Sequence, residues 1–161
     1  MNYYKMMYND LKKNKDLIKY LTIFDLKSNV SRTYLGILWW IIDPVLFMAI
    51  FYVLIHIILG RGGPDYPVVL FTALIPLKWT TACLVDATSA IIGKANIIRQ
   101  VYVSKIVFIT VRLLVNTFKF LISCLVLLIF LLIYGVEFNT YFFYFPLLII
   151  IHAIALFPLM I

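Results

Sequence analysis

Long runs of apolar residues, separated by short polar or glycine-rich segments, constrain this chain more than any other feature. The runs cover about residues 37–59, 68–92, 106–134 and 141–161. About 20 apolar residues are enough for a helix to cross the hydrocarbon core of a bilayer, where every backbone group must be hydrogen-bonded within the protein. The sequence therefore predicts an all-α integral membrane protein with four transmembrane helices.

The composition supports this prediction. Hydrophobic residues make up 65% of the 161 residues and charged residues only 13%, whereas about 25% of a soluble domain is charged. The first 30 residues contain no short apolar core followed by a small-residue cleavage site, so they do not resemble a cleavable signal peptide. Cys83 and Cys124 fall inside apolar runs, where we expect reduced cysteines that serve as small packing residues.

Basic residues are concentrated on one predicted side of the membrane. Seven of the 14 Lys and Arg residues precede residue 35, and three more lie in the loop at 93–105. Loops rich in Lys and Arg remain cytoplasmic. We therefore predict a cytoplasmic N-terminus, a cytoplasmic loop at 93–105, and outer loops near Arg61 and Glu137. The net charge of +7 is attributed to this topology and to anionic lipid, not to nucleic acid.

Residues 1–34 form a cytoplasmic interface unit in this prediction, followed by a transmembrane domain at 35–161. Between residues 5 and 29 the spacing predicts one amphipathic helix on the membrane surface. Its apolar side holds Leu17, Ile18, Tyr20, Leu21 and Phe24, and its charged side holds Lys15, Asp16 and Lys19. The helix serves as a basic membrane anchor or as a docking surface for a partner, and these two interpretations are compatible.

The stretch from residue 32 to 44 connects this helix to the first span. Arg and Tyr anchor chains at the lipid headgroups, Trp favours the membrane interface, and a proline inside a span removes a helical hydrogen bond. We expect a kink at Pro44 and a second one at Pro76. The predicted membrane anchor consists of Arg32, Tyr34, Gly36, Trp39 and Pro44.

Five ionisable residues lie within the apolar runs: Asp43, Lys78, Asp86, Arg112 and Lys119. Each costs a few kcal/mol or more if it faces lipid, so they should face protein or water. We expect Asp86 to pair with Arg112 or Lys119 across helices. Lys78, Asp86 and Lys119 are the candidates for a hydrated substrate path. The alternative for Asp43 and Arg112 is a position near the inner interface, where the side chains reach the headgroups.

Aromatic residues recur along the first span, at Trp40, Phe47 and Phe51. Rings of this kind could stack on the apolar faces of sugars and line a glycan path. Packing between helices or against lipid explains the spacing equally well, so both interpretations stay open.

Signatures of enzymatic sites are absent from the sequence. His56 and His152 each stand alone within an apolar run, without the His-Glu spacing of a metal site. There is also no glycine-rich phosphate loop after a strand and no Gly-x-Ser-x-Gly elbow. We therefore predict no catalytic residue, no metal and no cofactor bound by this chain itself. An isolated histidine in a span is expected to act as a packing residue or a hydrogen-bond partner.

Three motifs in order along the chain carry a family resemblance. They are Arg-Thr-Tyr-Leu-Gly-Ile-Leu-Trp at 32–39 with Asp43-Pro44, Ile-Pro-Leu-Lys-Trp at 75–79, and Asn-Ile-Ile-Arg-Gln-Val-Tyr at 96–102. Together they span residues 32–102 of the 161-residue chain. The sequence resembles ABC-2-type permeases that export cell-surface polysaccharides, of the Wzm and TagG/TarG type.

The resemblance implies a mechanism and a set of partners. Two permease chains would form a homodimer with a path between them, and a separate P-loop ATPase subunit would bind ATP and Mg²⁺. The cargo would be a lipid-linked glycan such as O-antigen, teichoic acid or a capsule-like polymer, carried across the bacterial cytoplasmic membrane. The segment that would couple to the ATPase contains Asn96, Ile97, Ile98, Arg99, Gln100 and Tyr102. From the residues alone, an ordinary basic turn is the alternative.

Two departures from the family pattern are visible. Val103-Ser104 stands where the family usually has Phe-Pro, and four spans are present where the family usually has six. The apolar end of the chain leads us to expect a partial permease. Other hypotheses are an ABC-2 drug or lipid exporter, a membrane scaffold that does not transport, and a membrane enzyme.

Overall fold

The computed structural model describes residues 3–63, 65–93, 104–136 and 144–160, and within these ranges the regular structure is entirely helical. The prediction of an all-α protein is confirmed. The elements are α1 (Tyr3–Lys13), α2 (Lys15–Ser31), η1 (Gly36–Leu38), α3 (Trp39–Tyr52), η2 (Val53–Ile58), α4 (Tyr66–Gly93), α6 (Lys105–Tyr134) and α7 (Tyr144–Met160).

Among the residues that the structure describes, three helical segments are long and apolar enough to cross a membrane: Gly36–Ile58, Tyr66–Ser89 and Lys105–Tyr134. Their bounds agree with the first three predicted spans to within a few residues. The fourth predicted span corresponds to α7, whose 17 residues are apolar. At 1.5 Å per residue, α7 is about 26 Å long, slightly less than the roughly 30 Å of a bilayer core.

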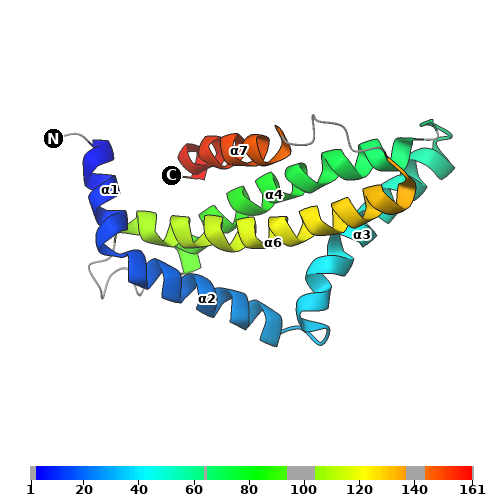
Figure 1. Cartoon of the computed structure of the whole chain (residues 1–161). Helices are drawn as coiled ribbons and strands as arrows, with labels where there is room; N and C mark the ends of the chain where they lie inside the picture. The colour runs from blue at the N-terminus through cyan, green and yellow to red at the C-terminus, as the bar shows by residue number, and fades with distance from the viewer. Residues whose placement is uncertain (1–2, 64, 94–103, 137–143, 161) are drawn as a thin grey trace.

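The core of the molecule lies between α4 and α6, which run side by side, with α7 on α4 (Figure 1). Trp79 of α4 stacks on Phe120 of α6 with ring centroids 4.2 Å apart, and Phe71 meets Phe130 edge to face at 5.3 Å. Cys83 and Cys124 are buried in this core and free, as the sequence predicted. Aromatic stacking and close packing therefore join the second and third spans.

The first span is built from three kinds of helix in succession. It opens with the 3₁₀ turn η1, continues as α3, and ends in the π-helix η2. Gly36 begins η1 with φ +55°, a backbone conformation that glycine adopts without steric cost. Pro44 and Pro76 both lie inside helices that continue past them. The kinks expected at these two prolines stay predictions.

The N-terminal segment forms two helices instead of the single helix predicted for residues 5–29. The chain divides at Asn14, where the side-chain amide donates to the carbonyl of Asp10 at 2.8 Å. The backbone N–H of Asn14 also donates to the Asp10 carbonyl, at 3.1 Å, so the side chain adds a second bond to that carbonyl where the two helices meet. Figure 1 shows α1 running across the end of α6 and α2 diverging from α6 towards α3.

The apolar side predicted for this segment is also divided. Ile18 packs on Val107, Val111 and Val115 of α6, together with partly buried leucines of α1 and α2. Tyr20 and Phe24 point elsewhere and are 67% and 56% exposed. Only part of the predicted apolar set therefore packs on α6, and its contact with the membrane surface stays a prediction.

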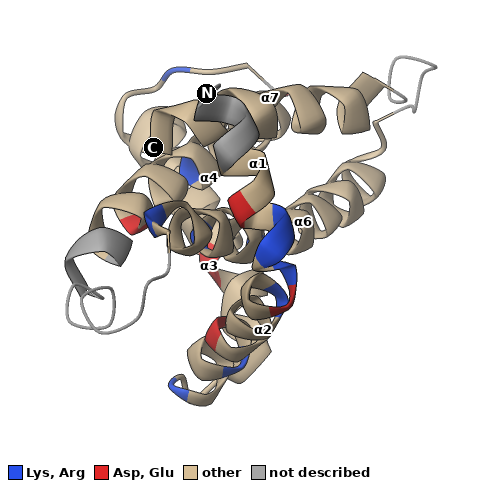
Figure 2. Ribbon diagram, turned by 90° about the vertical axis from the view of Figure 1, so that its left-hand side faces the viewer, with Lys and Arg blue, Asp and Glu red and all other residues tan. Residues whose placement is uncertain are grey.

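The contact with α2 gives a reason for the length of α6. At 30 residues, α6 is about 45 Å long, some 15 Å more than a bilayer core requires. Residues 106–109 at its beginning are all buried, and α2 covers this end. Figure 2 shows many of the charged residues on α1 and α2. We attribute the extra length to a portion of α6 that extends beyond the hydrocarbon to meet α2.

Candidate functional site

A cavity of about 100 Å³ lies between α3, α4 and α6, at the place where polar side chains from all three helices meet. Its apolar walls include Phe47, Trp79 and Phe120. The polar lining consists of Asp43 from α3, Lys78 from α4, and Asn116, Lys119 and Ser123 from α6. Polar groups within apolar spans are costly unless they pair or line a path. This cavity is therefore the candidate functional site.

Asp43 and Lys78 form an ion pair across the cavity, with the Lys78 Nζ donating to Asp43 Oδ2 at 2.5 Å. The same ammonium lies 4.8 Å from the centroid of the Phe47 ring, within range of a cation–π contact. The structure thus brings together Lys78 and Phe47, both predicted for the substrate path. Asp43 thus has a partner on α4, and its alternative position near the inner interface stays a prediction.

Lys119 supplies a second positive charge to the cavity. Its Nζ lies 6.0 Å from the centroid of the Trp40 ring. Within the described residues, Lys119 has no carboxylate at ion-pair distance, since the two pairs found there involve other cations. The cavity lining therefore carries one more positive than negative charge.

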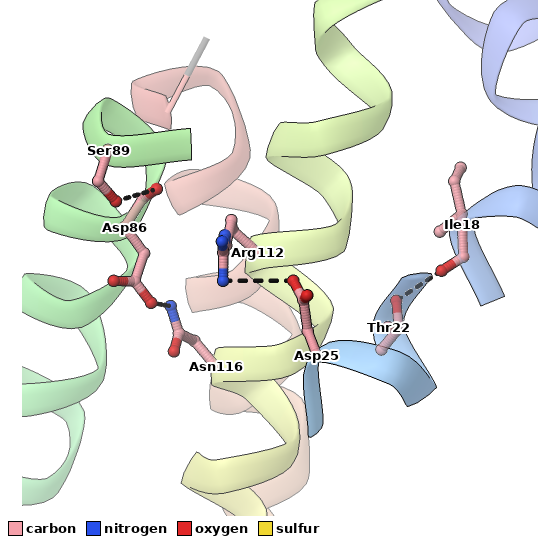
Figure 3. A network of polar contacts seen from close by, with 7 residues as sticks. All are labelled: Ile18, Thr22, Asp25, Asp86, Ser89, Arg112 and Asn116. Atoms are coloured by element: carbon pink, nitrogen blue, oxygen red, sulfur yellow. Dashed lines mark hydrogen bonds and ion pairs between the residues drawn. The ribbon is translucent and has the colours of Figure 1, made fainter. Parts of the chain in front are cut away.

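Asp86 and Arg112 have partners other than those predicted (Figure 3). Asn116 Nδ2 donates to Asp86 Oδ2 at 2.9 Å, and Arg112 lies 3.3 Å from Asp25 of α2. The expected pairing of Asp86 with Arg112 or Lys119 was wrong. Arg112 turns to α2, where Asp25 supplies a charge that helical spacing within the spans could not reveal.

Asn116 and Ser123 are the polar members of the site that sequence reasoning missed, and Asn116 has the clearer role. It is 3% exposed, and its hydrogen bond joins Asp86 to the cavity lining. A signal for it was present, because Arg112, Asn116, Lys119 and Ser123 recur at steps of four, three and four residues. That spacing places all four on one face of α6.

The predicted aromatic series of the first span does not form one continuous lining. Phe47 lines the cavity, and Phe51 packs against it with centroids 5.1 Å apart. Trp40 instead meets Phe118 of α6 edge to face at 6.1 Å. Two of the three rings therefore pack against other rings at positions outside the cavity lining.

The histidines behave as the sequence suggested. His152 of α7 lies 2.8 Å from the hydroxyl of Thr80, and its ring lies against Trp79 at 5.1 Å. His56 lies between the rings of Tyr52 and Tyr66, at 4.9 and 6.4 Å. One is a hydrogen-bond partner, and both are packing residues.

The predicted anchor residues lie where the chain enters the first span. Arg32, Tyr34 and Trp39 are exposed, and Pro44 is buried against the core. Gly36 allows the turn between α2 and η1. The predicted ATPase-coupling residues lie outside the described residues, and these are Asn96, Ile97, Ile98, Arg99, Gln100 and Tyr102.

Two curated relatives cover most of this chain. The "O-antigen export system permease protein RfbA" of Klebsiella pneumoniae is 30% identical over 131 residues, which are 81% of this chain and 50% of that protein. A protein of the same name from Myxococcus xanthus is 25% identical over 111 residues, 69% of this chain and 43% of that protein. No protein-family model and no solved structure matches the chain.

The resemblance to polysaccharide-exporting permeases is therefore confirmed, and the chain spans about half the length of the relatives it matches. With its apolar helices, the chain is an integral membrane protein.

Proposed function

We propose that this chain is part of the membrane-spanning subunit of an ABC exporter that moves a lipid-linked cell-surface polysaccharide across the cytoplasmic membrane. The observation that carries the proposal is the match of 81% of the chain to a protein named as an O-antigen export permease. O-antigen is one candidate cargo, and teichoic acid and capsule-like glycans are the others.

The proposal includes two partners. A separate cytoplasmic ATPase would bind ATP and Mg²⁺, and a second copy of this chain would complete the path. Segment 94–104 would seat on the ATPase and pass its movement directly to α4 and α6, which it connects. The N-terminus would be cytoplasmic, because half of the basic residues precede the first span.

The polar cavity supports an export role through its charge and its position. Lys78 and Asp43 come from different spans, so movement of α3 against α4 would open or close their contact. Lys119 adds a positive charge beside Trp40, where an anionic or hydroxyl-rich cargo could be held. Asp86 would act indirectly, by orienting Asn116. Under this proposal Lys78, Lys119 and Asp86 belong to the substrate path.

Co-purification tests the proposal most directly. The tagged chain is purified from its native membrane in mild detergent, and bound P-loop ATPase is identified by mass spectrometry. The test variant carries Arg99→Glu and Tyr102→Ala. The matched control carries Lys12→Glu, which also reverses a basic charge but lies on α1.

We expect an ATPase to accompany the parent chain and the Lys12→Glu control, and to be lost from the Arg99→Glu, Tyr102→Ala variant. An intact parent chain that brings no ATPase with it would contradict the exporter role and favour a scaffold. An ATPase retained equally by the test variant would contradict the assignment of the coupling segment.

A further inference from the structure

A second hollow, separate from the polar cavity, lies between α2, the beginning of the first span and α6. This groove has a volume of about 330 Å³. It is lined mainly by Ile23, Leu26, Val30, Ile37, Trp40 and Phe118, with Lys27 and Ser31 beside them. We propose that the groove binds an anionic phospholipid, with its acyl chain against the apolar wall and its headgroup at the lysines of α2.

The position of the groove beside two membrane spans argues for a lipid. Ile37 and Trp40 belong to the first span and Phe118 to α6, and Ile37 and Phe118 are 52% and 46% exposed. Exposed side chains on apolar spans face hydrocarbon, which a water-soluble partner cannot reach. The apolar wall therefore fits an acyl chain better than the surface of a soluble protein.

The charge at the rim argues for an anionic headgroup. Lys19, Ile23 and Lys27 follow one another at steps of four residues, so both lysines share the face of α2 that holds Ile23. Both lysines are exposed, and among the described residues the ion pairs involve only Lys78 and Arg112 as cations. The positive charge at the rim is thus not neutralised by the described protein. A lipid phosphate would neutralise it.

Trp40 lies in the wall of the groove and can report on its contents. Its ring lines the groove, meets Phe118 edge to face, and lies 6.0 Å from the Lys119 ammonium of the polar cavity. A lipid chain in the groove would contact this ring. The fluorescence of Trp40 therefore reports on whether the groove is occupied.

The test uses the full chain with Trp39→Phe and Trp79→Phe, which leaves Trp40 as its single tryptophan. It is reconstituted in phosphatidylcholine vesicles with either brominated phosphatidylglycerol or brominated phosphatidylcholine of identical acyl chains. Bromine quenches indole fluorescence on contact. We expect stronger quenching by phosphatidylglycerol than by phosphatidylcholine. The test variant carries Lys19→Gln with Lys27→Gln, and each substitution should lower the apparent preference for phosphatidylglycerol about fivefold.

The matched control is Lys12→Gln with Lys13→Gln, which removes the same charge from α1. It should retain the preference of the parent. Equal quenching by the two lipids, or the same loss in both double variants, would overturn the proposal. Native mass spectrometry of the chain with all three tryptophans counts retained phosphatidylglycerol independently. That count should fall in the Lys19→Gln, Lys27→Gln variant alone, and an unchanged count would also overturn the proposal.

Discussion

The first and second spans have similar lengths, yet the rest of the protein holds them very differently. In the most apolar stretch of the first span only 6% of the residues are buried, compared with 33% in the corresponding stretch of the second span. In α3 the buried residue is Pro44, whereas α4 contributes Phe71, Ile75, Trp79, Cys83 and Ala87 to the core. Apolar composition therefore places both helices in the membrane but does not decide which of them packs against the rest of the protein.

The contacts of the first span are few and mostly polar or aromatic. The Asp43–Lys78 pair and the Phe47 ring attach α3 to α4, and Trp40 attaches it to α6. Lipid chains solvate apolar side chains as well as a protein does, so shape and polar contacts decide which helices associate. The difference suggests that α4 and α6 form a fixed pair and that α3 is the span able to move against it.

The largest expected effect comes from damage to the α4–α6 pair. Trp79→Ala removes the stack on Phe120 and leaves a void, which should lower the free energy of unfolding by about 3–5 kcal/mol. Thermal unfolding in detergent, followed by maleimide labelling of the buried Cys83 and Cys124, would measure this loss. Leu77→Ala is the control, because Leu77 is a neighbour on α4 that is 59% exposed. Similar losses for both variants would contradict the packing difference.

A smaller effect is expected at the ion pair that joins α3 to the α4–α6 pair. Asp43→Asn and Lys78→Met should each lower stability by about 1–2 kcal/mol, since each leaves a charge without its partner. The double variant should cost less than the sum, with a coupling of about 0.5–2 kcal/mol. A double-mutant cycle on the same unfolding signal measures the coupling. Strict additivity would show that the pair does not hold α3 in place.

The smallest effect is expected on the exposed side of α3. Ile50 is 63% exposed, so Ile50→Ala should change the free energy of unfolding by less than about 0.5 kcal/mol. Leu125→Ala on α6, where the side chain is 59% exposed, provides the comparison. A large loss at Ile50 alone, seen in the same assay or as a shift in oligomeric state, would show that another protein surface covers the first span.

Sequence reasoning located the spans because hydropathy over some 20 residues is a local property. It could not find the pair of Asp43 with Lys78, which are 35 residues apart, or that of Asp25 with Arg112, which depends on how α2 meets α6. It predicted a single helix where the structure has two that meet at Asn14, because a break at one residue carries no periodic signal. The predicted candidates Phe47, Lys78 and Lys119 do line one cavity, whereas Trp40, Phe51 and Asp86 do not.

The π-helix at the end of the first span has a consequence for alignment and register. A π-helix accommodates one more residue than an α-helix over the same turn, so it behaves as a single-residue insertion. Removing one residue from Val53–Ile58 would restore α-helical spacing and leave the following segment in nearly the same orientation around the helix axis. The stack of His56 between Tyr52 and Tyr66 depends on the present register. A homologue one residue shorter here would therefore begin α4 at the same place with the same loop.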